Sequence, residues 1–399
     1  MLKSAIEFGL GRYWLKAIFL VWTRKSRVTA IASLVRKSLA CTVLLAASLL
    51  AQNPLSTEIE PKPSVEIDLR QFGYLHPVAE RDEWSYQLLS DPLLFLDSDH
   101  LAASFLVANP QPGLSSRANP FGSPVLFHTA AIDVDTGKAV WARSWGNDST
   151  SEALLQLDGG KLLVQSGYLL SLLGSDLNPL VTRQLEYSGD TLAEPFVSTT
   201  GRTLYLVQPT TPESTIAILD ADQLRIVKEY AVPRVVNFSA SDHYIAYSIE
   251  EGYFGNMSMR IQALDGEGPH LSFAHGNCYG YSPTFLSSST LVVTGGCPNF
   301  TFIDLSTKEM WQQKLPKASG TELRAARNAN RFAFELVEHH MDQPPTPLEV
   351  DVFDLDKRKT IFTLKVSKAG QRFSFALSPD GKKLAILQSP MVSVYTLPE

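Results

Sequence analysis

The sequence predicts an all-β fold, a seven-bladed β-propeller made of four-stranded antiparallel blades. Three observations support this prediction. An apolar residue followed by aspartate and a short polar turn recurs roughly every 40–50 residues, the period of a propeller blade. Turn-forming residues stand between these aspartate phrases, flanked by short apolar runs that favour strands. The last unit lacks one strand, while an additional strand precedes the first unit.

The aspartate phrase marks the connection between the last two strands of a unit. In each copy a polar turn separates two apolar runs, and a degenerate copy fills the gap between the first two clear ones. The copies are Ile132–Lys138, Leu173–Asp176 (degenerate), Leu219–Asp222, Leu264–Gly266, Ile303–Lys308 and Phe353–Asp356.

A second set of turns lies upstream in each unit. Glycine, asparagine and aspartate tolerate the positive φ angle of a tight hairpin turn. Runs such as Thr203–Val207 and Thr290–Val293 favour strands, and no long helical periodicity occurs after residue 52. The turns are Ser98–His100, Asp158–Gly160, Thr200–Arg202, Ser241–His243, Ser287–Ser289, Asn328–Asn330 and Pro379–Gly381.

The strand count predicts how the ring closes. Six complete units run from about Leu93 to Val366, and a seventh, which begins at Phe373, has only three strands. The additional strand, Ser64–Phe72, alternates apolar and polar residues and would complete this last blade. Closure of this kind removes the exposed sheet edges that invite aggregation. Six or eight blades are the alternatives.

Two family resemblances accompany these repeats. Ala131–Trp141 is similar to the repeat of quinoprotein-like (PQQ-type) propellers, and Phe302–Trp311 is a weaker copy. Ser378–Ala385 resembles the WD40-like repeat of many exported bacterial propellers. The Gly-His and Trp-Asp pairs of WD40 repeats are missing, as are the adjacent cysteines and calcium-binding acids of quinone-dependent dehydrogenases. The resemblance therefore implies the architecture of residues 64–399 and leaves catalysis unsupported. We expect no cofactor and assign no catalytic residues.

The first 51 residues have the composition of a secretory signal peptide. A basic region up to Lys37 precedes the uncharged apolar run Leu39–Ala51, which is shorter than the ~20 residues of a membrane span. Residues 52–63 form a Pro-rich linker, and we expect the mature protein to be exported to the periplasm or the extracellular space. Because the basic region is long, translation could start at Val35 instead. The alternative to cleavage is an uncleaved N-terminal anchor, the one expected membrane attachment.

Charge and cysteine content narrow the function classes. A net charge of −6 argues against nucleic-acid binding, which needs clustered basic residues. After cleavage only Cys278 and Cys297 remain, and they would face each other if Ser287–Ser288 were a two-residue turn. Export favours a disulfide between them. Two free thiols or a shifted register are the alternatives.

The predicted loops are unequal on the two faces of the ring. Turns between the first and second strands, and between the third and fourth, are short, so all insertions fall on the opposite face, where binding usually resides. The insertions are Gly73–Ser90, Val107–Pro124, Ser144–Glu152, Glu250–Ser258, Ala274–Ser282 and Val337–Pro347. Their aromatic residues are candidates for binding a partner, or they fill the channel and cover the blades: Trp84, Tyr86, Trp145, Tyr253, Phe254, Tyr279 and Tyr281.

Two functions are compatible with these features. The first is a non-catalytic exported scaffold that binds a protein or cell-envelope component through the insertion-bearing face. The alternative is a hydrolase, lyase or lactonase with a site at the channel mouth, for which His275, Glu335 and Asp342 are scattered candidates. His339–Asp342 resembles a metal site, but adjacent histidines of a strand point to opposite sides, so we expect no metal there.

Overall fold

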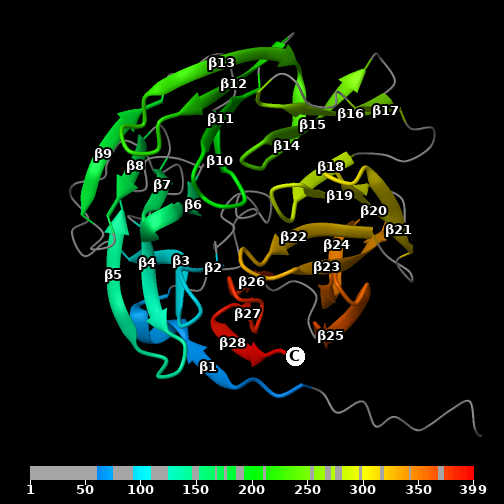
Figure 1. Cartoon of the computed structure of the whole chain (residues 1–399). Coiled ribbons are helices and arrows are strands. Elements are labelled where there is room, and N and C mark those ends of the chain that lie inside the picture. The colour runs from blue at the N-terminus through cyan, green and yellow to red at the C-terminus, as the bar shows by residue number, and fades with distance from the viewer. Residues whose placement is uncertain are drawn as a thin grey trace, which may run out of the picture. The chain divides into compact units, whose positions relative to one another are not determined.

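Seven four-stranded antiparallel sheets form the blades of a ring (Figure 1). The prediction of a seven-bladed β-propeller is confirmed. In this computed structural model the residues Pro61–Glu399 form a compact unit. The structure describes residues 61–74, 93–108, 125–145, 152–166, 169–174, 178–185, 193–209, 213–251, 256–265, 271–274, 281–295, 299–314, 319–340, 343–366 and 373–399. No helix within these ranges is long and apolar enough to cross a membrane.

Each blade takes its strands in chain order from the channel outward. Blade 1 contains β2 (Leu93–Phe95), β3 (His100–Ala108), β4 (Val125–Asp133) and β5 (Ala139–Trp145), and blade 2 contains β6 (Glu152–Gln156), β7 (Leu162–Ser166), β8 (Leu169–Leu173) and β9 (Pro179–Gln184). Blade 3 contains β10 (Glu194–Val197), β11 (Leu204–Gln208), β12 (Glu213–Leu219) and β13 (Ile226–Pro233). Blade 4 contains β14 (Val235–Ala240), β15 (Tyr244–Glu251), β16 (Asn256–Ala263) and β17 (Leu271–Ala274).

Blades 5 to 7 follow the same order, except that the outermost strand of blade 7 comes from the start of the described chain. Blade 5 contains β18 (Tyr281–Phe285), β19 (Thr290–Gly295), β20 (Asn299–Asp304) and β21 (Glu309–Lys314). Blade 6 contains β22 (Ser319–Ala325), β23 (Arg331–His340), β24 (Gln343–Asp354) and β25 (Lys359–Lys365). Blade 7 contains β26 (Phe373–Leu377), β27 (Lys383–Gln388), β28 (Met391–Thr396) and β1 (Val65–Asp68).

Strand β1 closes the ring as predicted. It pairs antiparallel with β28, with Val65 opposite Val394 and Ile67 opposite Val392 (Figure 1). The strand is shorter than the predicted Ser64–Phe72, because a 3₁₀ helix, η1 (Leu69–Phe72), begins after Asp68. The Asp68 carboxylate accepts the Arg70 backbone N–H at 3.0 Å, which turns the chain out of the strand.

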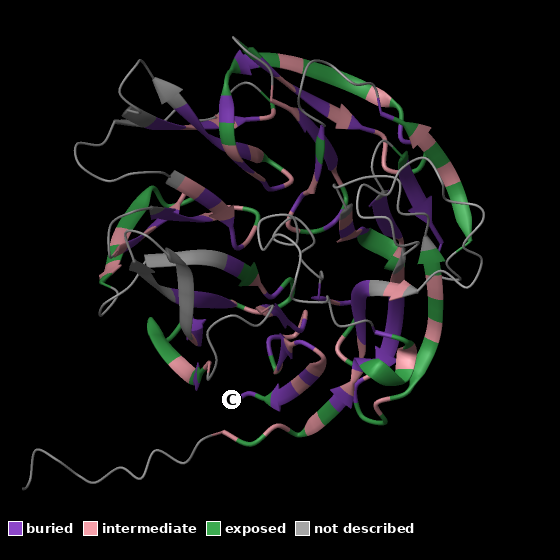
Figure 2. Cartoon of the chain, turned by 180° about the vertical axis from the view of Figure 1, so that it is seen from behind, coloured by how far each residue is buried: buried purple, intermediate pink, exposed green. Residues whose placement is uncertain are grey.

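Every gap between neighbouring blades contains its own apolar cluster, seven in all among the described residues. Inner strands are buried on both faces, so β27 has four consecutive buried residues. Outer strands alternate: β9 and β21 expose every second residue (Figure 2). Strands covered on both sides read as apolar runs rather than alternating patterns.

The gap between blades 5 and 6 is the most aromatic. Five phenylalanines there are almost fully buried, and the Trp311 ring stacks on Phe302 with centroids 3.8 Å apart. The Arg358 guanidinium lies over the Trp311 ring, 5.1 Å from the ring centroid. The phenylalanines are Phe300, Phe302, Phe332, Phe334 and Phe353.

The recurrent aspartate has a structural reason. In Asp133, Asp220 and Asp304 the carboxylate accepts backbone N–H groups two and three residues ahead. Hydrogen bonds lower the pKa of each carboxyl group, chiefly those from the backbone at Asp133 and Asp220 and that from the Ser306 hydroxyl at Asp304. This contact fixes the turn between the third and fourth strands. Four residues after the aspartate, the backbone is left-handed in blades 1, 3, 5 and 6, at Gly137, Leu224, Lys308 and Arg358.

Glycine at this turn position is expected to stabilise the protein. Lys308 has φ of 62° and an exposed side chain, so Lys308→Gly relieves backbone strain and should raise the free energy of unfolding by about 0.5–1 kcal/mol. The control is Leu224→Gly, which also loses a buried side chain and should destabilise. Urea unfolding of both variants tests this. A loss of stability in Lys308→Gly would contradict it.

Two predicted loops differ from the structure. The insertion predicted over Val337–Pro347 is largely a hairpin, because β23 and β24 stay paired as far as His340 and Gln343. The turn between β18 and β19 is also longer than predicted. Leu286 N–H donates to the Thr290 carbonyl at 2.8 Å, closing a four-residue connection.

This turn shifts the register on which the cysteine pairing depended. Tyr281 lies opposite Gly295 and Phe285 opposite Leu291, one residue away from the register of a two-residue turn. The two-residue turn from which we predicted that Cys278 faces Cys297 was therefore wrong. Both cysteines lie outside the described residues, and the disulfide itself stays a prediction.

Candidate functional site

The turns between first and second strands converge around the channel on one face of the ring, here called the turn face (Figure 1). The opposite face, which carries the predicted insertions, is the loop face. The second residue after the end of each blade's first strand is acidic, small or proline in six blades. In blade 6 this residue is arginine. These residues are Asp97, Asp158, Thr199, Asp242, Ser287, Arg327 and Pro379.

Local hydrogen bonds hold these turns in place. In five blades a serine or aspartate side chain at the start of the turn accepts one or two backbone N–H groups further along the turn. Such contacts define a turn by its own sequence and do not depend on the neighbouring blade. The acceptors are Asp97, Ser198, Ser241, Ser287 and Ser378.

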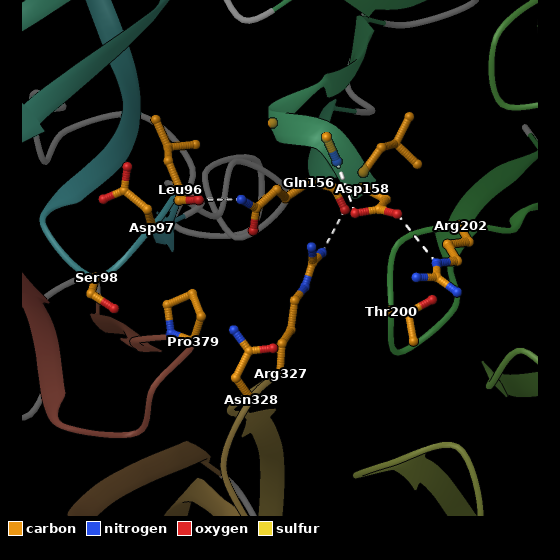
Figure 3. Close-up of a pocket in the computed structure, with 13 residues that line it drawn as sticks. Leu96, Asp97, Ser98, Gln156, Asp158, Thr200, Arg202, Arg327, Asn328 and Pro379 are labelled. Carbon is orange, nitrogen blue, oxygen red and sulfur yellow. Dashed lines mark hydrogen bonds and ion pairs between the residues drawn. The ribbon is translucent and has the colours of Figure 1, made fainter.

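A cavity of about 420 Å³ opens among these turns. Blades 1, 2, 3, 6 and 7 contribute to its wall, so it lies where non-adjacent blades approach one another across the axis (Figure 3). The lining residues are Leu96, Asp97, Ser98, Gln156, Leu157, Asp158, Gly159, Gly160, Thr200, Arg202, Arg327, Asn328 and Pro379.

Arg327 spans the cavity. Its Nη2 donates to the Gln156 carbonyl of blade 2, and the Gln156 side-chain amide donates to the Leu96 carbonyl of blade 1 (Figure 3). On the blade 6 side, Asn328 N–H donates to the Pro379 carbonyl at 2.8 Å. A single chain of hydrogen bonds therefore joins four blades.

Asp158 anchors the other side of the cavity. Its backbone N–H donates to the Gly201 carbonyl at 2.9 Å, and its carboxylate Oδ2 lies 3.2 Å from Arg202 Nε. Gly201 has φ of 82°, and a Cβ there would lie 2.7 Å from the Asp158 nitrogen. This close approach requires glycine.

The side chains that line the cavity include two acids and two arginines, and the protein shifts the pKa of one member of each kind. Arg327 as a whole is exposed, but protein atoms packed around its guanidinium lower the pKa of that group by desolvation, and nearby Asp158 offsets part of this effect. Burial alone would raise the pKa of Asp97, but hydrogen bonds from His100 and from two backbone N–H groups outweigh it, and the pKa is lowered. The site offers two carboxylates and two guanidinium groups, an arrangement that recognises polar or charged groups.

A second cavity, of about 860 Å³, lies on the turn face over blades 5, 6 and 7 and shares Arg327 and Asn328 with the first. Arg331 organises it, since Nη1 donates to the Gly381 carbonyl at 2.9 Å and Nε lies 3.5 Å from Asp354 Oδ2. Both described cavities thus open on the turn face rather than on the predicted binding face.

The predicted aromatic binding residues are largely untested. Trp145 is the last residue of β5 and Tyr281 the first of β18, so their backbones end at the loop face. The other five lie outside the described residues: Trp84, Tyr86, Tyr253, Phe254 and Tyr279.

Of the three scattered catalytic candidates, one lies within the described chain, so their assembly into a site stays a prediction. Glu335 is 9% exposed in β23, a second strand, and His275 and Asp342 lie outside the described residues. Within the described ranges, no three histidine, cysteine or acidic side chains form a group that could hold a metal ion.

Sequence reasoning missed Arg327. A signal was present: once the seven turns are aligned, Arg327 is the single basic residue at its position. Its reach across the axis depends on ring closure, which brings blades 2 and 6 together.

One buried acid outside the cavity has a strongly shifted pKa. Asp351 on β24 is 7% exposed beside Phe334, and burial raises its pKa to about 6, with a smaller contribution from Glu349. The Thr363 hydroxyl donates to Asp351 Oδ1 at 2.5 Å, which opposes the shift.

We expect Asp351→Asn to stabilise the protein at neutral pH. A folded-state pKa near 6 means that the free energy of unfolding is greatest below pH 4, falls as the pH rises to about 6 and then levels off. The neutral amide removes this fall, so the free energy of unfolding should rise by up to about 3 kcal/mol at pH 8 and change little at pH 4. Urea unfolding across pH tests it, with exposed Glu309→Gln as the control. Equal gains at both pH values would contradict it.

Comparisons with known proteins bear on the fold alone. No family model matches the chain, and no curated protein sequence matches it. Among solved structures, a chain of the mitotic checkpoint complex is similar at 12% identity and a TM-score of 0.55, over 87% of this chain and 95% of that one. Kuenenia stuttgartiensis hydrazine synthase is similar at 13% identity and a TM-score of 0.53, over 81% and 99%. Both similarities support the β-propeller fold.

Proposed function

We propose that the protein is an exported scaffold that binds a protein or a cell-envelope component through its loop face. One observation carries the proposal: the longest segments between described strands, 69–92 and 109–124, connect strand ends on that face. Long segments on a rigid ring provide variable contact surface while the blades stay fixed. Trp145 and Tyr281 border this surface, and aromatic residues supply much of the energy in protein interfaces.

The similar structures are consistent with this role. One of them is a chain of the mitotic checkpoint complex, so a similar fold occurs within a complex. The other belongs to hydrazine synthase, so the same fold also occurs in an enzyme. The fold alone does not distinguish binding from catalysis.

The binding proposal is tested with matched variants of the mature chain. Partners that co-purify from the envelope fraction are identified, and direct binding of the main one is then measured with purified proteins. A triple replacement of Trp145, Tyr253 and Phe254 by alanine should weaken this binding at least tenfold. The turn-face control, Arg202→Gln, should leave it unchanged. Binding unaffected by the loop-face variant, or lost equally in both, would refute the proposal.

Export is tested separately by the N-terminus of the mature protein. The proposal predicts cleavage after Ser48 or Ala51, and a mature chain found outside the cytoplasm. A chain in the cytoplasm that retains residues 35–51 would contradict export. A precursor peptide from residues 1–34 would rule out the start at Val35.

A further inference from the structure

Arg327 lines the turn-face cavity, and its guanidinium has few partners. It has five N–H donors, and the structure assigns it one hydrogen bond, from Nη2 to the Gln156 carbonyl. Among the described residues, no carboxylate lies within the 4.0 Å distance of an ion pair with it. The residue is exposed to solvent, so guanidinium donors without a protein partner are accessible to a ligand.

The nearest acid is already engaged. The Asp158 carboxylate pairs with Arg202 and accepts the Gly159 N–H at 2.9 Å. On the far wall, the Asp97 carboxylate lies 2.8 Å from the His100 ring nitrogen. Neither acid lies within ion-pair distance of Arg327, and all three residues line the same cavity (Figure 3).

The surrounding wall keeps this space open. A Cβ at Gly201 would lie 3.1 Å from Arg327 Nη1, so glycine lets the turn approach the guanidinium without covering it. Asn328 and Gly160 also line the cavity, and its volume of about 420 Å³ suits a small molecule or one side chain rather than a folded domain.

The charge balance selects the class of ligand. Among the lining residues, the negative charges of Asp97 and Asp158 balance the positive charges of Arg202 and Arg327. A ligand with a second negative charge would therefore be repelled by the two carboxylates. Phosphate carries that second charge near neutral pH, whereas a carboxylate does not. A carboxylate also matches the planar fork of arginine through two parallel hydrogen bonds.

We propose that the channel mouth on the turn face is a binding site for a single carboxylate group, held by Arg327. The carboxylate comes from a small free acid or from a peptide, as a side chain or a C-terminus. This site lies on the face opposite the proposed partner surface and is independent of it.

The first test measures thermal unfolding of the mature chain in sodium acetate, sodium chloride and sodium phosphate at equal ionic strength. Acetate should raise the unfolding temperature of the wild type more than chloride or phosphate does, because a ligand that binds the folded state stabilises it. Arg327→Gln should abolish this difference, and Arg327→Lys should reduce it, since lysine keeps the charge but not the fork. Arg225→Gln removes an exposed arginine outside the cavity and should keep the full difference.

The second test separates the two sources by calorimetric titration with three capped dipeptides. N-acetyl-Ala-Asp-amide carries a side-chain carboxylate, N-acetyl-Ala-Ala a C-terminal one, and N-acetyl-Ala-Asn-amide neither. A peptide source predicts that one of the first two binds at least tenfold more tightly than acetate; a free acid predicts no gain. The proposal is overturned if acetate shifts the wild type, Arg327→Gln and Arg327→Lys equally, or if phosphate binds more tightly than acetate.

Discussion

Replacing Ile67 by aspartate is expected to lower the free energy of unfolding by more than about 4 kcal/mol. Ile67 is 1% exposed between blades 7 and 1, in the cluster that also contains Leu69, Val392 and Val394. Truncation of a buried isoleucine alone costs about 2–5 kcal/mol, and burial of a carboxylate there adds a desolvation penalty.

Because Ile67 lies on the strand that closes the ring, its replacement is expected to cost more free energy of unfolding than the loss of local packing alone. If β1 detaches, the edge of β28 is exposed and blade 7 loses its outermost strand. The control is Glu66→Ala on the same strand, whose exposed side chain should contribute less than about 0.5 kcal/mol. Urea unfolding measures both. Similar stability in the two variants would show that β1 is not part of the ring.

Phe302→Ala is expected to cost about 3–5 kcal/mol. Phe302 is fully buried, stacks on Trp311, and contacts Phe332 and Phe353 across the gap between blades 5 and 6. The cavity left behind is surrounded by rigid rings in two sheets, so the site has little freedom to collapse. Loss of the stacked ring also removes an aromatic contact beyond the area buried.

The matched control lies on the outer strand of the same blade. Met310 is 59% exposed, and Met310→Ala should change the free energy of unfolding by less than about 0.5 kcal/mol. Chemical unfolding of both variants tests the claim that aromatic packing binds blades 5 and 6 together. A cost below about 1 kcal/mol for Phe302→Ala would contradict it.

Much of the fold was predictable because the same local chemistry recurs in each blade. The aspartates that end third strands, such as Asp133 and Asp304, fix their turns through their own backbone contacts. Strand order and the missing strand of the last unit then left one arrangement for the strand around Ile67. These are local signals repeated along the chain.

Finer features were less predictable, because they depend on single contacts. The strand at Ile67 ends early because Asp68 accepts a backbone N–H, and the turn at Leu286 contains more residues than its serines indicated. The cavity at Arg327 was missed because it requires residues from blades far apart in the chain, which only the closed ring brings together. Aromatic content directed attention to the loop face, whereas the described cavities open on the turn face.

The most direct test of the closed ring is a cross-link between β1 and β28. Glu66 and Ser393 are directly opposite each other, and opposed strand residues have Cα atoms about 4.5–5.5 Å apart, within disulfide range. The double variant Glu66→Cys with Ser393→Cys should form one new disulfide completely, found by peptide mapping as a linked pair containing these positions. The shifted control, Glu66→Cys with Met391→Cys, should form far less. No linkage in the first variant, or equal linkage in both, would contradict closure of the ring by the N-terminal strand.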